Sequence, residues 1–234
     1  MGAELALCLR NVEIKFSEVI LFRCAQGEKK FMQTFYKVAQ IFGRQTGVFR
    51  VPTAKRGDVF LCVRRTNYLN DERTVVEVDA MRFLDLWRQP YSSHEDVAHR
   101  TPETWPRDYK FHEAESGFSG GESNPVPLAR VGCYRQVIER AVWQRKFWFF
   151  QRFAGVEITH FPTLGFSDGV TRTIWLLTAG ATVFPVECPQ RDAAFLQEMA
   201  GVAGGSIQTV EQLVPAYNWS MLASEQESVN GDDA

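Results

Sequence analysis

The chain has 234 residues, of which 45% are hydrophobic and 23% are charged, and its formal net charge is −2 at pH 7. This size fits one domain or a domain with a substantial extension, and 18 Phe and 6 Trp residues supply enough apolar surface for a core. This net charge excludes a protein whose overall positive charge attracts nucleic acids, but it still allows a local basic patch that binds them. Five scattered cysteines without a CxxC pair argue against a disulfide framework and a zinc site. We therefore expect reduced thiols in a cytoplasmic protein. No apolar run is long enough to cross a bilayer, so we expect no membrane insertion.

Residues 1–100 are predicted to form an α/β region of their own. Apolar runs with β-branched residues predict strands, and apolar residues at helical spacing predict helices. Asp79 is the expected cap of the second helix. The expected elements are strands at 13–16 and 19–22, a helix at 30–42, strands at 59–63 and 74–78 around a turn at 67–71, and a helix at 79–88.

Residues 101–215 are predicted to form a second domain, which an acidic, flexible tail at 216–234 follows. The stretch 89–121 is polar and rich in Pro, Gly and Ser, so we expect a long loop there. The expected elements after it are a strand at 124–131, a long helix at 134–153, a strand at 155–161, and helices at 190–200 and 210–213.

The segment 166–188 is the most informative part of the sequence, because it reads as strand, tight turn, short helix, turn and strand. Asp168 can cap the helix, and Gly169 allows another group to approach the turn. An apolar face follows from the spacing of Val170, Ile174 and Leu177, and Gly180 is a suitable left-handed stop.

The start of this helix is a candidate phosphate cradle. A helix N-terminus offers free N–H groups and a favourable dipole, and Arg172 adds a guanidinium suited to phosphate. The candidate phosphate- or nucleotide-binding residues in this turn are Gly169, Val170, Thr171, Arg172 and Thr173. Two roles remain open for Asp168, a helix cap or a metal ligand and water-orienting base. The alternative for the whole turn is a well-capped helix that binds nothing.

The polar loop before residue 124 is a second candidate region. If it folds over the turn, Glu115 and Glu122 can help Asp168 to hold a divalent metal. Glu115 is therefore a candidate catalytic residue and metal ligand together with Asp168. Ser119, Gly120 and Asn124 are candidate contributors to the phosphate site. A solvated acidic loop is the alternative.

The predicted helix at 134–153 mixes aromatic residues with basic ones. Such a mixture suits single-stranded nucleic acid, because rings stack on bases and cations follow the phosphates. Arg140, Arg145 and Lys146 are the candidate contacts. An amphipathic helix with a wet basic face explains the same pattern without a ligand.

The turn from Asp168 to Arg172 and the closing strand Phe184-Pro185-Val186-Glu187 resemble the signature segment of the ParB/sulfiredoxin superfamily. Together with 115–120 and 124–129, the segment 168–188 also resembles the plasmid fertility-inhibition factors of the Osa and FiwA type. The resemblance covers roughly residues 103–190. It implies an α/β fold with a ParB/sulfiredoxin-like core and an N-terminal α/β elaboration. Sulfiredoxin chemistry itself is not expected, because Val170 and Thr171 stand where it needs a cysteine.

The family resemblance also implies a function. Members of this kind block the transfer of a rival plasmid through a type IV secretion system, and they are linked to ATPase and DNase activity. The implied cofactors are ATP or another nucleotide with Mg²⁺, and the implied partner is the transferred DNA. In the alternative, the protein is a non-enzymatic inhibitor that binds a coupling ATPase or relaxase, with the ParB-like core as a scaffold.

Overall fold

The structure, a computed structural model, describes residues 32–67, 69–147 and 150–216. This part of the chain combines mixed sheets with helices, so the predicted α/β class is confirmed. The strands expected at 13–16 and 19–22 lie outside the described residues, as does the expected tail beyond residue 216.

Within the described part of the chain, one sheet has four strands in the order β1-β2-β3-β5. Its strands are β1 (Phe35–Ile41), β2 (Arg44–Thr53), β3 (Gly57–Arg64) and β5 (Val126–Pro127). The helix predicted at 30–42 is wrong, because the described part of that range is mostly strand β1. Phe42 and Gly43, with φ of 50° and 72°, form a two-residue turn that suits a hairpin between β1 and β2.

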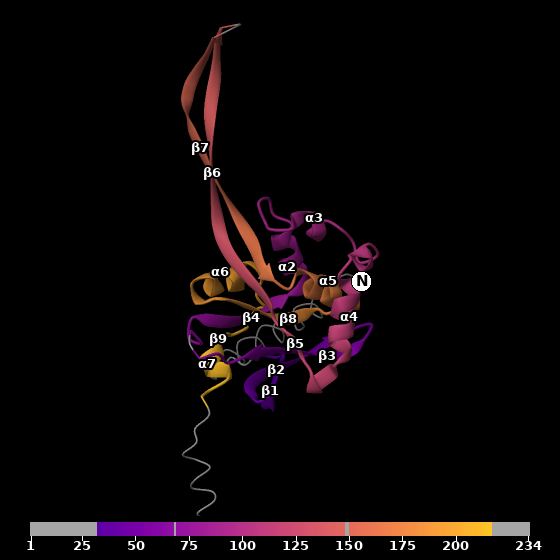
Figure 1. Ribbon diagram of the computed structural model, residues 1–234. Coiled ribbons are helices and arrows are strands. Elements are labelled where there is room, and N and C mark those ends of the chain that lie inside the picture. Colours follow the sequence, from indigo (N-terminus) through magenta and orange to yellow (C-terminus); the bar gives the residue numbers. More distant parts are fainter. Residues whose placement is uncertain (1–31, 68, 148–149, 217–234) are drawn as a thin grey trace, which may run out of the picture. The chain divides into compact units, whose positions relative to one another are not determined.

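The second sheet has five strands in the order β7-β6-β8-β4-β9. Strand β4 is Arg73–Asp79, β6 is Ala129–Phe147, β7 is Phe150–Asp168, β8 is Val183–Pro189 and β9 is Ile207–Thr209. The middle residues of β4 and β8 are all buried, which requires that both faces of these strands are covered. In Figure 1, helices α2, α5 and α6 lie on one side of β4 and β8, and the four-stranded sheet lies on the other. Each sheet contains strands from before and after residue 100.

The α-helices among the described residues are α2 (Ala80–Trp87), α3 (Glu95–Ala98), α4 (Phe111–Ser119), α5 (Val170–Ala179), α6 (Gln190–Ala200) and α7 (Val210–Leu213). Asp79 caps α2 as predicted, since its carboxylate accepts from the N–H groups of Met81 and Arg82. The predicted loop at 89–121 is wrong in part, because it contains α3, α4 and a short 3-10 helix at Trp105–Arg107. Another 3-10 turn, Gly121–Ser123, follows α4. Within the described residues, no helix is long and apolar enough to cross a membrane.

The long helix predicted at 134–153 is also wrong. Strands β6 and β7 pair antiparallel over this range and form a two-stranded ribbon that extends beyond the rest of their sheet (Figure 1). The strand predicted at 155–161 is confirmed as a part of β7, whereas the strand predicted at 124–131 is split between two sheets. Strand β5 pairs with β3 and β6 pairs with β8, so the chain changes sheets at Leu128.

Candidate functional site: a cavity at the start of helix α5

The predicted strand–turn–helix at 166–180 is present. Strand β7 ends at Asp168, α5 begins at Val170, and both flanking glycines are left-handed, with φ of 94° at Gly169 and 81° at Gly180. Ile174 is fully buried on the predicted apolar face of the helix, and Val170 and Leu177 pack against the core as partly buried side chains. Asp168 is not the helix cap. Gly169 holds that position, and no side chain caps the first turn of α5.

The open side of Gly169 is filled by strand β6. A Cβ atom at Gly169 would lie 2.7 Å from both the Cα and the Cβ of Ala129. The glycine is therefore required for close packing between the start of β6 and the start of α5. The sequence predicted a close approach at this glycine, and the group that approaches is Ala129 of the same chain.

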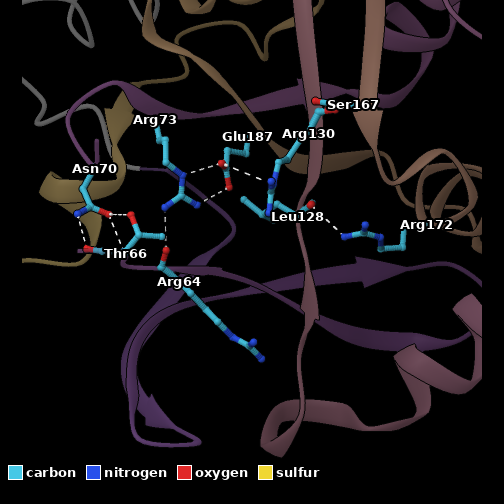
Figure 2. Close-up of polar contacts among 9 residues, drawn as sticks. All are labelled: Arg64, Thr66, Asn70, Arg73, Leu128, Arg130, Ser167, Arg172 and Glu187. Atoms are coloured by element: carbon cyan, nitrogen blue, oxygen red, sulfur yellow. Dashed lines mark hydrogen bonds and ion pairs between the residues drawn. The ribbon is translucent and has the colours of Figure 1, made fainter. Parts of the chain in front are cut away.

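Arg172 connects three segments of the chain. Its Nη1 donates to the carbonyl oxygens of Pro127 and Leu128 at 2.6 and 3.0 Å, and its Nη2 lies 2.5 Å from Oδ2 of Asp168. Figure 2 shows the guanidinium directed at the backbone of Leu128. The side chain is only 15% exposed. Arg172 therefore holds the crossing between β5 and β6 against the first turn of α5.

The pKa of Asp168 is lowered from its ordinary value. Partial burial raises this pKa, but the hydrogen bond and charge of Arg172 outweigh that effect, and the N–H of Gly169 and the charge of Arg130 add to it. Asp168 is therefore ionised at neutral pH and paired with Arg172. A phosphate bound beside Arg172 without a cation would be repelled by this carboxylate.

A cavity of about 710 Å³ opens at this end of α5. The turn contributes its amides, the segment around α3 and α4 forms the opposite wall, and Val126 and Pro127 of β5 complete the lining. Both basic and acidic side chains line the cavity. Its lining residues are His94, Asp96, Val97, Asp108, Tyr109, Lys110, Glu113, Ala114, Gly117, Val126, Pro127 and Phe166 to Arg172.

Of the predicted phosphate-site residues in the turn, Gly169, Val170, Thr171 and Arg172 line this cavity, whereas Thr173 does not. Thr173 is fully buried, and its N–H and hydroxyl both donate to the carbonyl of Gly169 at 3.0 Å. Its role is therefore to close the first turn of the helix.

The predicted residues of the acidic loop lie elsewhere. Glu115 pairs with Arg56 at 2.7 Å, Glu122 pairs with Lys37, and neither lines the cavity. The structure therefore does not bring Glu115 to Asp168 as a metal pair. Ser119, Gly120 and Asn124 are also absent from the cavity lining. The Ser119 hydroxyl donates to the carbonyl of Ser116 at 2.6 Å, and Gly120 packs closely on Asn124.

Among the described residues, no group of three His, Cys, Asp or Glu side chains is arranged to hold a metal. The carboxylate of Asp168 is also already paired with the guanidinium of Arg172, so it does not need a metal to balance its charge. The chain thus offers N–H donors and Lys110 to an oxygen-rich anion, and it offers single carboxylates rather than an assembled metal cage.

An ion pair supports the sheet beside this site. Arg73 of β4 forms two parallel bonds of 2.8 and 2.9 Å with Glu187 of β8, and it donates to the carbonyl of Arg64 in β3 (Figure 2). Glu187 is 8% exposed, and the guanidinium of Arg130 lies 4.0 Å away from it. A nearly buried carboxylate paired in this bidentate way fixes its neighbours in position. The pair therefore links both sheets close to the start of β6.

The candidate nucleic-acid residues lie on the ribbon and not on a helix. Arg140 and Arg145 are exposed on β6, where an odd spacing places them on opposite faces. Lys146 follows Arg145 near the end of β6. Arg140 and Arg145 therefore do not share a face of the ribbon.

Half of the cavity wall is not among the residues predicted for the site. His94, Asp108 and Lys110 come from the stretch expected to be a loop, and Glu113 lines the cavity where Glu115 was expected. The signal was the helix α4 itself, because residues 113, 114 and 117 share one helical face and 115 faces elsewhere.

Comparisons with known proteins agree with this fold. A family model described as plasmid fertility inhibition factor (PFIN) matches residues 75–201. Protein osa of Shigella flexneri is 27% identical over 157 residues, which span 67% of this chain and 69% of that protein. The crystal structure of the Oncogenic Suppression Activity protein, a plasmid fertility inhibition factor, superposes with a TM-score of 0.52 at 21% identity and covers 95% of this chain and 96% of that one.

The family match includes β4, α2, the cavity wall, the ribbon, α5 and α6. The likeness to the solved structure shows the fold, since its sequence identity is low. The ParB/sulfiredoxin relationship is not among these findings and stays a prediction. Because the family model covers more than half of the sequence, the chain belongs to the plasmid fertility inhibition factor family, of the Osa type.

Proposed function

We propose that this protein blocks conjugative transfer of a rival plasmid through a type IV secretion system, and that the cavity at α5 binds phosphoryl oxygens of a nucleotide or of DNA. Membership of the fertility inhibition family supports the first part. The observation that carries the second part is the first turn of α5, which no side chain caps and whose residues Val170 to Arg172 line the cavity. Unpaired amides at a helix N-terminus are suited to phosphate.

The neighbouring side chains define how such a ligand would be held. Thr171 and Lys110 line the cavity and supply a hydroxyl and a cation. Arg172 acts in the first place by position, because its bonds to Pro127 and Leu128 fix the amides relative to β6. If a nucleotide arrives with Mg²⁺, Asp168 is the predicted ligand that lines the cavity, and the ion would offset repulsion between phosphate and carboxylate.

Phosphoryl transfer at this site, as ATPase or DNase activity, is the catalytic form of the proposal. Arg172 would stabilise charge on the phosphoryl oxygens, and Asp168 would orient water. For either role, the bond between Arg172 and Asp168 has to open. The non-enzymatic alternative is favoured by this same contact, since a guanidinium with three protein acceptors needs no ligand to explain it.

The test uses the full chain and a Lys110→Ala variant, with Lys55→Ala as the matched control outside the cavity lining. Binding of a fluorescent ATP analogue, nucleotide hydrolysis with and without Mg²⁺, plasmid nicking and the block of conjugation are measured for each. We expect Lys110→Ala to weaken nucleotide binding about tenfold and Lys55→Ala to leave it unchanged. Wild-type protein that blocks conjugation but neither binds or hydrolyses nucleotide nor nicks plasmid DNA would refute the phosphate site and leave the docking inhibitor.

A further inference from the structure

The outer part of the β6–β7 ribbon has one apolar and one polar face. Directly paired residues of antiparallel strands share a face, and successive residues alternate. One face carries the pairs Val137–His160, Glu139–Ile158, Ala141–Val156 and Trp143–Phe153. The other carries Ile138–Thr159, Arg140–Glu157, Val142–Gly155 and Gln144–Arg152, so its large side chains are mostly polar. We call the large apolar side chains of the first face the apolar stripe: Val137, Trp143, Phe153, Val156 and Ile158.

The apolar stripe is open to solvent. Its side chains keep between 46% and 57% of their surface exposed, and the rings of Trp143 and Phe153 meet edge to face at 5.7 Å. Strands with alternating apolar and polar residues are patterned for burial of one face. An isolated two-stranded hairpin is also marginally stable in water. The ribbon therefore has the composition of a sheet layer whose covering surface is missing.

We propose that the apolar stripe is covered by the same stripe of a second copy of this chain. The stripe is self-complementary about its middle, where the pair Ala141–Val156 has the smallest side chains. Bulkier groups follow on both sides, with Ile158 toward the sheet and Trp143 with Phe153 toward the ribbon's end. When two ribbons pack antiparallel about a two-fold axis at Ala141, Ile158 of each copy lies against the aromatic pair of the other.

The charges on the stripe's face fit this arrangement. Glu139 lies one pair before Ala141, and Arg145 lies two pairs after it on the same face. Pairs on one face repeat about every 7 Å, so Arg145 of one copy falls one pair from Glu139 of the other, within reach of two long side chains. A polyanion is a poorer fit, because Glu139 stands on the stripe's face and Glu157 stands directly opposite Arg140 on the other face.

The available area suits a reversible dimer. Aromatic side chains bury about 150–250 Å² each, and two of them are half exposed here. With the three aliphatic side chains and a polar rim, two copies together would cover about 1,000 Å², which is the lower end of specific interfaces. We therefore expect self-association with a Kd in the range of about 1–100 μM. This inference does not rest on the proposed function.

Sedimentation velocity of the full chain over about 1–200 μM tests the proposal. We expect a concentration-dependent dimer that Ile158→Ser weakens at least tenfold. Ile138→Ser is the matched control, because it removes an isoleucine from the polar face of the same ribbon. Circular dichroism checks that both variants fold. A chain that stays monomeric throughout, or equal effects of the two variants, would overturn the proposal.

A cross-linking experiment tests the two-fold axis itself. Sheets that pack face to face lie about 10 Å apart, which is too far for a direct disulfide but within reach of a short bismaleimide linker. The linker should therefore join Ala141→Cys between two copies and should not join Arg140→Cys on the opposite face, with wild-type protein as the control for native thiols. Adding Ile158→Ser to Ala141→Cys should reduce the cross-link at least tenfold. Equal cross-linking of the two cysteine variants would contradict the arrangement. A monomer whose affinity for a labelled single-stranded oligonucleotide falls with Trp143→Ser would show a nucleic-acid surface and would likewise overturn it.

Discussion

Replacing Gly169 by alanine should destabilise the fold by about 2–4 kcal/mol. The backbone there has a φ of 94°, and a left-handed conformation costs an L-residue about 1–2 kcal/mol. The added Cβ would lie 2.7 Å from two atoms of Ala129, which is itself buried at 4% exposure. Neither of these atoms belongs to a flexible side chain, so strand and helix must separate, and overpacking of this kind costs about 1–3 kcal/mol.

Gly204→Ala is the matched control for this prediction. Gly204 also has a positive φ, of 73°, but an added Cβ would meet nothing within 4 Å. This variant should lose only the conformational part, about 1 kcal/mol. Urea unfolding of both variants and the wild type, followed by circular dichroism, gives the two free-energy differences. If Gly169→Ala cost no more than Gly204→Ala, the contact with Ala129 would not be the reason for the glycine.

Three further predictions concern the same region and its neighbours. Arg172→Ala should lower the free energy of unfolding by about 2–3 kcal/mol in a urea titration, because the carbonyls of Pro127 and Leu128 lose their donor. The control is Arg191→Ala, which removes a side chain that is 87% exposed and should change this free energy by no more than about 0.5 kcal/mol. The pKa of Asp168 is lowered in the fold, so its contribution to the free energy of unfolding is complete above its unfolded pKa and is lost in acid. The difference in this free energy between wild type and Asp168→Asn should be constant from pH 7 to about pH 5 and shrink below about pH 4. A difference that persists unchanged at pH 3 would contradict this. Burial raises the pKa of Cys133 and Cys188 to about 12, so iodoacetamide at pH 8 should alkylate them only in denaturant. Peptide mass spectrometry measures the labelling, and rapid labelling of the native protein would contradict this prediction.

The turn at α5 could be predicted because all of its signals are local. Gly169 and Gly180 bracket a ten-residue helix, and the apolar spacing between them has the helical period. What the sequence could not provide is the partner of each group. Arg172 bonds to carbonyls 44 and 45 residues away, and Ala129 fills the space that Gly169 leaves. A guanidinium that looks free in the sequence is therefore occupied in the fold.

The ribbon was mistaken for a helix for a physical reason. Val137, Ile138, Ala141 and Val142 recur at a spacing that fits one helical face, whereas in the ribbon they are divided between two faces. Arg, Gln, Glu and Ala around them also favour helices. The connection between β6 and β7 lacks the Gly, Asn, Asp or Pro that usually marks a hairpin turn. By contrast, the missed hairpin of β1 and β2 had such a mark, Phe42-Gly43.

The occupied guanidinium changes how the phosphate site should be understood. An arginine that moves freely can contribute charge to a ligand but cannot fix other donors. Arg172 is held by two carbonyls and one carboxylate, so it keeps β6, Asp168 and the first turn of α5 in one arrangement. Donors that are fixed before a ligand arrives lose little freedom on binding. Arg172→Lys, which retains the charge but loses the planar fork, should therefore weaken nucleotide binding nearly as much as Arg172→Ala, whereas a purely electrostatic role would let lysine restore most of the affinity.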